Sequence, residues 1–116
     1  QKFPCYTLPV IPDNCASAYY KCYVFVNPDN LNPGWSRDRI MKEINDLGVP
    51  CFSGSCTEIY KEKCFKPFES IYNRTLPVAA DMGSRSILFL IDPTIDTEKI
   101  NSTIHAINIV SSQASQ

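Results

Sequence analysis

A continuous apolar run, "SILFLI", occupies residues 86–91. Such a run is typical of a β-strand that is covered on both faces or lies under helices. A second strand is predicted over residues 19–26, where "YYKCYVFV" is rich in aromatic and β-branched side chains and precedes the turn-forming segment "NPDNLNPG". Any fold of this chain therefore has to bury a sheet.

A helix is predicted between these strands, directly after Ser36, which stands at an N-cap position before "RDRIMKEINDLG". Ile40, Ile44 and Leu47 recur at helical spacing, and Gly48 supplies a C-terminal stop. A brief apolar strand is expected next, within "VPCFS".

Two further segments carry signals for the start of a helix. Ser55 and Glu58 form an S-x-x-E capping box, which predicts a helix through about Phe65. Pro77 suits the first turn of a short helix, "PVAADMG", that ends at Gly83.

The last helix is predicted to begin at a cap formed by Asp96 or Thr97 and to run through "TEKINSTIHAINIV". Asp92, before it, is expected to serve a turn rather than catalysis. His105 is the only histidine, and we expect a partly exposed helix residue rather than the base of a Cys/His pair. The helix carries one apolar stripe: Ile100, Ile104, Ile107 and Val110.

The element order is strand, helix, strand, two helices, strand, helix, in a chain whose 116 residues suit a single domain. This order predicts an α/β (α+β) fold in which three or four strands pack with helices. Residues 1–17 are expected to form an extended lead-in arm, residues 18–111 the folded domain and residues 112–116 a frayed tail.

Charge and hydropathy exclude several kinds of partner. Eleven Lys and Arg against twelve Asp and Glu give a net charge of -1, so we expect neither nucleic acid nor an anionic membrane as a partner. No apolar run approaches the roughly 20 residues that span a bilayer. Because the chain begins with Gln1 rather than Met, we expect an upstream part in a longer protein.

The sequence has six cysteines, an even count that permits a disulfide framework. Cys22 and Cys64 fall in a predicted strand and a predicted helix, which favours reduced, mostly buried thiols. Glycosylation sequons at Asn73 and Asn101 leave a secreted, disulfide-stapled domain open as an alternative. No cysteine pair has the C-x2-C spacing of a zinc site, so no metal is expected.

The stretch "GVPCFSGSC" at residues 48–56 lies just before the capping-box helix. Gly54 permits a close backbone approach, and the amides of Ser55, Cys56 and Thr57 would lie at a helix N-terminus, where anionic groups bind. A plain capped turn between strand and helix fits the same residues. Spacing alone leaves both interpretations open.

Three blocks of the sequence resemble, in this order, the C-terminal domain of the DegT/DnrJ/EryC1/StrS aminotransferases: "SAYYKCYVFV", "GWSRDRIMKEINDLGVPCFSGSCTEIYKEKCF" and "LPVAADMGSRSILFLIDPT". These are pyridoxal-phosphate enzymes of nucleotide-sugar and amino-sugar biosynthesis. The resemblance covers about residues 9–110. It implies a small, mainly antiparallel sheet with helices on one side, normally joined to a large domain that carries the cofactor.

In this family the loop that matches residues 51–56 borders the active-site cleft. The resemblance therefore implies that Ser53, Gly54, Ser55 and Cys56 line a substrate or cofactor cleft, together with Lys21 on the first strand. No lysine of the chain lies in a motif that matches the lysine of the cofactor Schiff base, so no catalytic residue is expected here.

The cofactor implied is pyridoxal phosphate in the full-length enzyme, with none expected on this chain alone. The partners implied are an N-terminal pyridoxal-phosphate domain of the same protein, a second copy in a homodimer and a nucleotide-sugar substrate. A cytoplasmic location is expected.

The chain is thus interpreted as part of an enzyme that moves an amino group from glutamate or glutamine to a nucleotide-linked keto-sugar, inactive in isolation. Two alternatives stay open. One is a secreted, disulfide-stapled and glycosylated binding domain, and the other is an aminotransferase-like domain that mediates interactions without catalysis.

Overall fold

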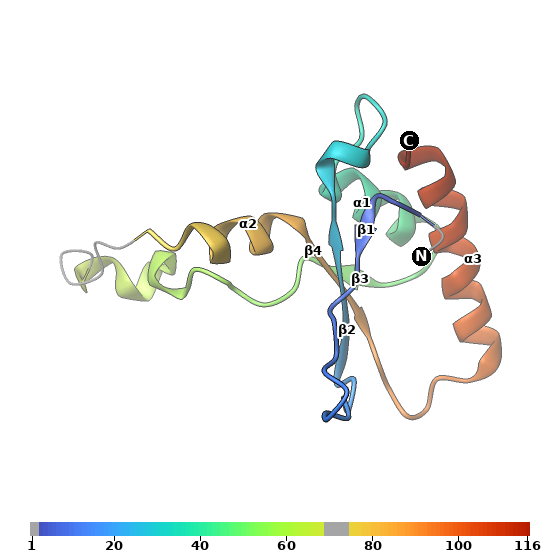
Figure 1. Cartoon of the computed structure of the whole chain (residues 1–116), viewed down its shortest axis with the longest axis horizontal. Coiled ribbons are helices and arrows are strands. Elements are labelled where there is room, and N and C mark those ends of the chain that lie inside the picture. The colour runs from blue at the N-terminus through green and yellow to red at the C-terminus, as the bar shows by residue number, and fades with distance from the viewer. Residues whose placement is uncertain (1–2, 69–74) are drawn as a thin grey trace.

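A computed structural model describes residues 3–68 and 75–116 (Figure 1). In these residues one sheet has four strands in the order β1-β2-β4-β3, and every neighbouring pair is antiparallel. The strands are β1 (Tyr6–Thr7), β2 (Lys21–Val26), β3 (Cys51–Phe52) and β4 (Ser86–Leu90). The predicted α+β fold with a mainly antiparallel sheet of three to four strands is confirmed.

Helices α1 (Arg37–Asp46) and α3 (Thr97–Ala114) lie on one face of the sheet (Figure 1). Successive strand residues point to opposite faces, so Cys22, Val24 and Val26 of β2 point toward these helices and pack in or against the core. The buried core residues are Cys5, Val26, Leu31, Ile40, Ile44, Val49, Cys51, Ile87, Phe89, Ala106, Val110 and Ala114.

Helix α1 matches its prediction except at Leu47, which follows the last helical residue and is 49% exposed. The Ser36 side chain accepts a hydrogen bond from the backbone N–H of Arg39 at 3.2 Å, which is the expected N-cap contact. Ile40 and Ile44 are fully buried. Gly48 follows the helix with a φ of +81°, a conformation that a glycine adopts without strain.

Strand β2 begins at Lys21, two residues later than predicted. Tyr19 has a φ of +43°, outside the β region, and its backbone N–H donates to Ser17 Oγ at 3.1 Å. The predicted sheet role of the aromatic residues is correct for Tyr23 and Phe25, whose rings stack with centroids 6.5 Å apart on the face away from α1 and α3.

The predicted apolar stripe of α3 is only half correct. Val110 is buried and Ile107 packs against the core, but Ile100 and Ile104 are 47% and 52% exposed. Helix α3 has 18 residues and α1 has 10, so the N-terminal turns of α3 extend beyond the helix that packs against it. His105 is exposed, as expected for a surface residue of this helix.

The predicted frayed tail is instead ordered. Helix α3 continues to Ala114, which is fully buried, and Ser115 forms an isolated bridge with Leu31. Asn32 adds side-chain hydrogen bonds to the carbonyls of Gln113 and Ser115 at 2.9 and 3.1 Å. The C-terminus is thereby fixed to the segment that precedes α1.

Part of the expected lead-in arm belongs to the sheet. Strand β1 pairs with the end of β2 in the register Tyr6 with Val26, and Cys5 is fully buried. The backbone N–H of Asn27 donates to the Cys5 carbonyl at 2.7 Å. The domain boundaries themselves stay a prediction.

The helix predicted from the capping box of Ser55 and Glu58 is wrong. Two short 3-10 helices, η2 (Ile59–Lys61) and η3 (Lys63–Phe68), take its place. The two capping-box side chains bond elsewhere, Ser55 to Tyr23 and Glu58 to Tyr60 and Lys61. Helix α2 (Pro77–Arg85) has Pro77 in its first turn as predicted and runs past Gly83, with Arg85 paired to Asp81 one turn before it.

Residues 53–68 and 75–85 form a projecting arm, which extends from the sheet on the side opposite α3 (Figure 1). The radius of gyration of the chain is 16.3 Å. A compact domain of this length would have a value of about 13 Å. Four large apolar side chains on the arm are strongly exposed: Ile59, Phe68, Leu76 and Val78.

All six cysteines are free, as predicted. Their expected burial is correct for Cys5 and Cys51, whereas Cys15, Cys56 and Cys64 are exposed and Cys22 is partly buried. Within the described ranges no helix is long and apolar enough to cross a bilayer. The sequon Asn101 lies on α3, and Asn73 lies outside the described residues.

Candidate functional site

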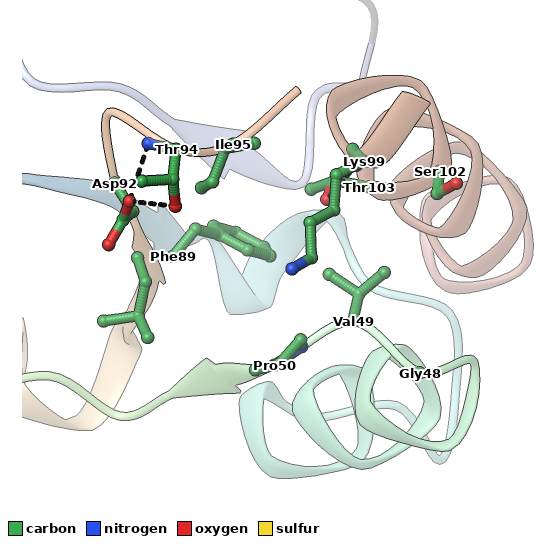
Figure 2. A pocket seen from close by; sticks show the side chains of 11 residues that line it. Gly48, Val49, Pro50, Phe89, Asp92, Thr94, Ile95, Lys99, Ser102 and Thr103 are labelled. Carbon is green, nitrogen blue, oxygen red and sulfur yellow. Dashed lines mark hydrogen bonds between the residues drawn. The ribbon is translucent and has the colours of Figure 1, made fainter. Parts of the chain in front are cut away.

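Two pockets lie near opposite ends of β4. The pocket in Figure 2 adjoins the C-terminal end of β4 and contains none of the predicted site residues. The other is open and shallow, has a volume of about 480 Å³ and lies between the loop after β3 and α2. We call it the loop pocket. Its lining residues are Arg37, Ser53, Gly54, Ser55, Cys56, Thr57, Glu58, Lys61, Glu62, Ala80, Gly83 and Ser84.

Four of the five predicted cleft residues thus share one pocket: Ser53, Gly54, Ser55 and Cys56. Lys21 does not line it. Lys21 pairs with Leu90 at the far end of β4 from Ser86, and its amine lies 5.6 Å from the ring centroid of Tyr20. The structure therefore does not bring Lys21 together with the other four.

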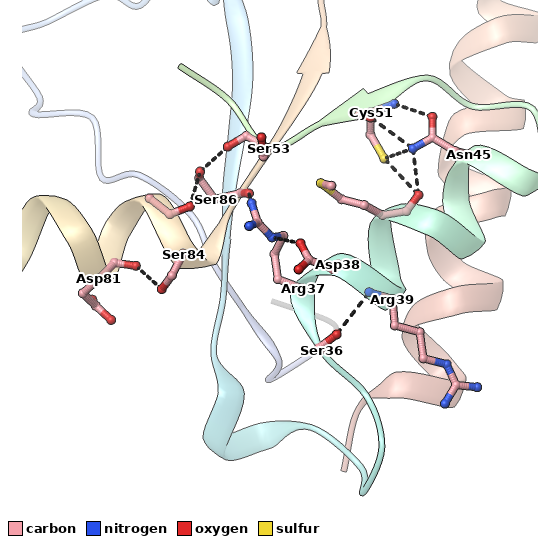
Figure 3. Close-up of polar contacts among 12 residues, drawn as sticks. Ser36, Arg37, Asp38, Arg39, Asn45, Cys51, Ser53, Asp81, Ser84 and Ser86 are labelled. Carbon is pink, nitrogen blue, oxygen red and sulfur yellow. Dashed lines mark hydrogen bonds and ion pairs between the residues drawn. The ribbon is translucent and has the colours of Figure 1, made fainter. Parts of the chain in front are cut away.

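Ser86, the first residue of β4, fixes the start of the loop (Figure 3). Its side chain is buried, and its hydroxyl lies 2.5 Å from the carbonyl oxygen of Ser53, to which it donates. The Ser86 carbonyl in turn accepts a hydrogen bond from Arg37 Nη1 at 3.0 Å. A buried serine hydroxyl without a hydrogen-bond partner would destabilise the folded state.

Gly54 makes the close backbone approach that the sequence predicts, but against a side chain of the same domain. Its φ is +91°, and a Cβ atom at this position would lie only 2.8 Å from Tyr23 Cε1. The next residue, Ser55, donates its backbone N–H to the Tyr23 hydroxyl at 3.3 Å. Tyr23 therefore contacts the loop at two successive residues, with its ring against Gly54 and its hydroxyl at Ser55.

Helix α2 forms the opposite wall of the loop pocket. A Cβ atom at Gly83 would clash with Thr57 Oγ1 and would lie 3.2 Å from Thr57 Cβ. Only a glycine at this helix position lets Thr57 come so close. Gly83, which the sequence pattern assigns to the end of a helix, instead sets the distance between α2 and the loop.

The hypothesis of an anion site at the amides of Ser55, Cys56 and Thr57 assumed a helix that the structure does not contain there. No α-helix starts after them in the described part of the chain, and the Ser55 amide is already bonded to Tyr23. The helix N-terminus on which this hypothesis depended is therefore not present among the described residues.

The two cations among the described residues that line the loop pocket, Arg37 and Lys61, are paired with carboxylates of the protein. Lys61 pairs with Glu58 at 2.8 Å, and this contact, with the Tyr60 hydroxyl, lowers the pKa of the Glu58 carboxyl. Arg37 Nε lies 2.7 Å from an Asp38 carboxylate oxygen. Glu62 adds a further negative charge to the lining.

Cys56 is exposed but is not an activated nucleophile. Glu62 beside it, together with partial desolvation, raises the pKa of its thiol. A reactive cysteine has the opposite environment, in which positive charge lowers the pKa. Cys56 therefore contributes shape and a weak donor to the pocket.

Cys51, at the start of β3, has a structural role (Figure 3). Burial raises the pKa of its thiol to about 11. Its backbone N–H donates to Asn45 Oδ1 at 3.3 Å, and Asn45 Nδ2 donates to its carbonyl at 3.1 Å. These contacts join α1 to β3, next to the loop.

Sequence reasoning missed three residues that shape the site: Tyr23, Ser86 and Gly83. Each was assigned to regular secondary structure, where its residue type is ordinary. Tyr23 and Ser86 contact the loop from paired strands and Gly83 contacts it from α2, so these roles become visible only in the tertiary structure.

No protein-family model and no curated protein matches this sequence. Among solved structures, the chain is similar to the aminotransferase from Psychrobacter cryohalolentis, with 50% sequence identity, a TM-score of 0.78 and coverage of 84% of this chain. It spans only 25% of that protein's length. The chain is an aminotransferase-like domain.

Proposed function

We propose that the chain is the C-terminal small domain of a pyridoxal-phosphate-dependent aminotransferase of the DegT/DnrJ/EryC1/StrS family. The full enzyme would transfer an amino group from glutamate or glutamine to a nucleotide-linked keto-sugar. The observation that carries this proposal is the 50% identity, over 84% of the chain, to a solved aminotransferase. The three sequence blocks that resemble the family support its finer assignment.

Pyridoxal phosphate supplies an electron sink to enzymes of this kind. The loop pocket does not fit the whole cofactor, because both cations among its described lining residues have partners within the chain. The amine of Lys61 pairs with Glu58, and Arg37 binds Asp38 and the Ser86 carbonyl. In the proposed enzyme the cofactor would therefore be held by residues of an N-terminal domain.

The chain's own residues would form one wall of the cleft. Tyr23 and Ser86 hold the loop from two sides, so that Ser53, Gly54 and Ser55 face the pocket in a fixed conformation. A fixed loop can position a substrate and exclude water without providing a reactive group. This role explains why the loop carries small side chains and no activated nucleophile.

A chimera tests the proposal. This chain would replace the matching quarter of the Psychrobacter cryohalolentis aminotransferase, and amino transfer from glutamate would be measured. We expect the chimera to bind pyridoxal phosphate and to be active. A folded chimera that binds the cofactor but transfers no amino group would contradict the enzyme assignment and favour the non-catalytic alternative.

Bulky substitutions in the chimera test the loop's role. Ser55→Trp and Cys56→Trp should raise KM or lower kcat by about tenfold or more, since displaced positioning groups cost this much. Ser17→Trp, in an exposed segment outside the pocket, is the matched control. Unchanged kinetics in both loop variants would show that the loop pocket does not border the substrate.

A homodimer and a cytoplasmic location complete the proposal. Six unpaired thiols, three of them exposed, support a reducing compartment, because exposed thiols in an oxidising one form disulfides. They also speak against the secreted, disulfide-stapled alternative. Thiol titration of protein purified without reductant checks this, with six free thiols expected.

A further inference from the structure

A second pocket, of about 310 Å³, lies where the end of β4, the following turn and the first turns of α3 meet (Figure 2). We propose that it binds a small monocarboxylate with an apolar body. We call it the α3 pocket. Its lining residues are Gly48, Val49, Pro50, Phe89, Leu90, Asp92, Thr94, Ile95, Lys99, Ser102 and Thr103. None of these lines the loop pocket, so the inference goes beyond the proposed function.

The α3 pocket contains a cation, Lys99, whose positive charge also acts on Asp92 of the same lining. In Figure 2 the Lys99 side chain extends from α3 and its amine points toward Phe89 and Val49. Within residues 3–68 and 75–116, no carboxylate forms an ion pair with this amine. Lys99 is an exposed residue, and a carboxylate bound in the pocket would give its amine a charge-assisted hydrogen bond.

The floor and walls of the pocket are apolar. Val49 and Phe89 are buried core residues whose side chains reach the pocket, and Pro50 and Ile95 extend this surface. An aromatic or branched aliphatic group would bury its surface against them. The volume lies at the lower end of the roughly 300–1,000 Å³ typical of ligand sites, which limits the ligand to a small molecule.

Asp92 restricts the ligand to a single negative charge. The Asp92 Oδ1 atom accepts hydrogen bonds from the Thr94 N–H at 2.7 Å and the Thr94 hydroxyl at 2.6 Å. These bonds, with a smaller contribution from the positive charge of Lys99, lower the pKa of the Asp92 carboxyl and keep it ionised. In Figure 2, Asp92 and Lys99 lie on opposite sides of Phe89, so a ligand carboxylate at Lys99 leaves its other end facing a negative charge.

Titration of the full 116-residue chain with 3-phenylpropanoate, followed by amide chemical shifts, tests the inference. We expect saturable shifts at Val49, Ile95 and Lys99. The neutral alcohol 3-phenylpropanol and the dicarboxylate phenylsuccinate should each bind about tenfold more weakly, a difference of about 1.4 kcal/mol. Equal binding of all three compounds would overturn the charge assignment.

Variants locate the site. Lys99→Gln keeps the helix propensity of the residue but removes its charge and shortens the side chain by one atom, and should weaken binding of 3-phenylpropanoate about tenfold. Lys66→Gln, on the projecting arm, should leave binding unchanged. The inference is overturned if no saturable shifts appear, or if a Lys99→Gln protein with a native amide spectrum binds as well as the unmodified chain.

Discussion

The Tyr23 hydroxyl lies 3.2 Å from Ser55 Oγ and accepts a hydrogen bond from the Ser55 backbone N–H at 3.3 Å, although the two residues are 32 positions apart. This pair connects the middle of β2 to the loop that follows β3. It acts on the face of the sheet away from α1 and α3, where the projecting arm begins. The conformation of the candidate site therefore depends on a tyrosine in the sheet.

Removal of the Tyr23 hydroxyl should remove the hydrogen bonds that hold the loop and leave the strand pairing of the sheet intact. Tyr23→Phe retains the ring that packs on Gly54 and loses both contacts to Ser55, so we expect the free energy of unfolding to fall by about 1 kcal/mol. Urea unfolding measures the change. Tyr20→Phe is the control, because Tyr20 is 82% exposed. Equal stability of the two variants would mean that the Tyr23 contacts contribute nothing.

Gly54 and Gly48 allow backbone strain to be separated from a steric clash. Both have positive φ values, +91° and +81°, but a Cβ atom at Gly48 would meet no atom within 4 Å. Gly48→Ala should cost about 1–2 kcal/mol from backbone strain alone. Gly54→Ala should cost at least about 1 kcal/mol more, because its Cβ also clashes with Tyr23. Thermal unfolding of both variants checks the order, and a reversed order would refute the close contact.

Cys56 should react slowly for an exposed thiol, because Glu62 raises its pKa and lowers the fraction of thiolate at pH 8. Glu62→Gln should speed alkylation of Cys56 about two- to tenfold. Peptide mass spectrometry after a short exposure to iodoacetamide measures the rate at each cysteine. Glu98→Gln, on α3, should leave the Cys56 rate unchanged, and an unaltered rate in Glu62→Gln would contradict the assignment.

The buried thiol of Cys51 should make stability fall at alkaline pH. Folding raises its pKa from the ordinary value of 9.0 to about 11, so the folded state favours the neutral thiol. The resulting stabilisation is complete below pH 9 and is lost as the pH rises through 11. In urea unfolding, Cys51→Ala should therefore show a smaller decline between pH 8 and 11 than the unmodified chain. Cys15→Ala, at an exposed site, should retain the full decline.

Local sequence signals correctly predicted the elements whose caps, apolar faces and stops are all formed by residues of the same element. The Ser36 cap, the spacing of Ile40 and Ile44 and the stop at Gly48 lie within one helix, so α1 follows from its own residues. Asp96 likewise caps α3 as predicted, through a hydrogen bond from the Lys99 N–H at 2.8 Å. Likewise, the apolar run of β4 indicated a buried strand, and residues 86–89 are buried.

The same local signals failed where a distant group competed for the residues involved. Ser55 has the sequence context of a helix cap, yet Tyr23 bonds both its side chain and its amide. Glu58, the partner in the predicted capping box, binds Tyr60 and Lys61 instead. A local sequence pattern does not show whether Ser55 caps a helix or bonds to a residue of a distant strand, because that strand's position is not known from the pattern.

The sequence by itself determined that this chain forms an α+β domain with a loop of small residues after its short strand, because strand and helix periodicities and end caps are properties of neighbouring residues. That the sheet is mainly antiparallel was implied only by the family resemblance. Only the tertiary structure decided how that loop is held and which half of α3 is buried. These depend on strand pairing, which brings Tyr23 and Ser86 to the loop, and on the lengths of the two packed helices. Such contacts join residues far apart in the chain, so they can stabilise the loop only after the sheet has formed.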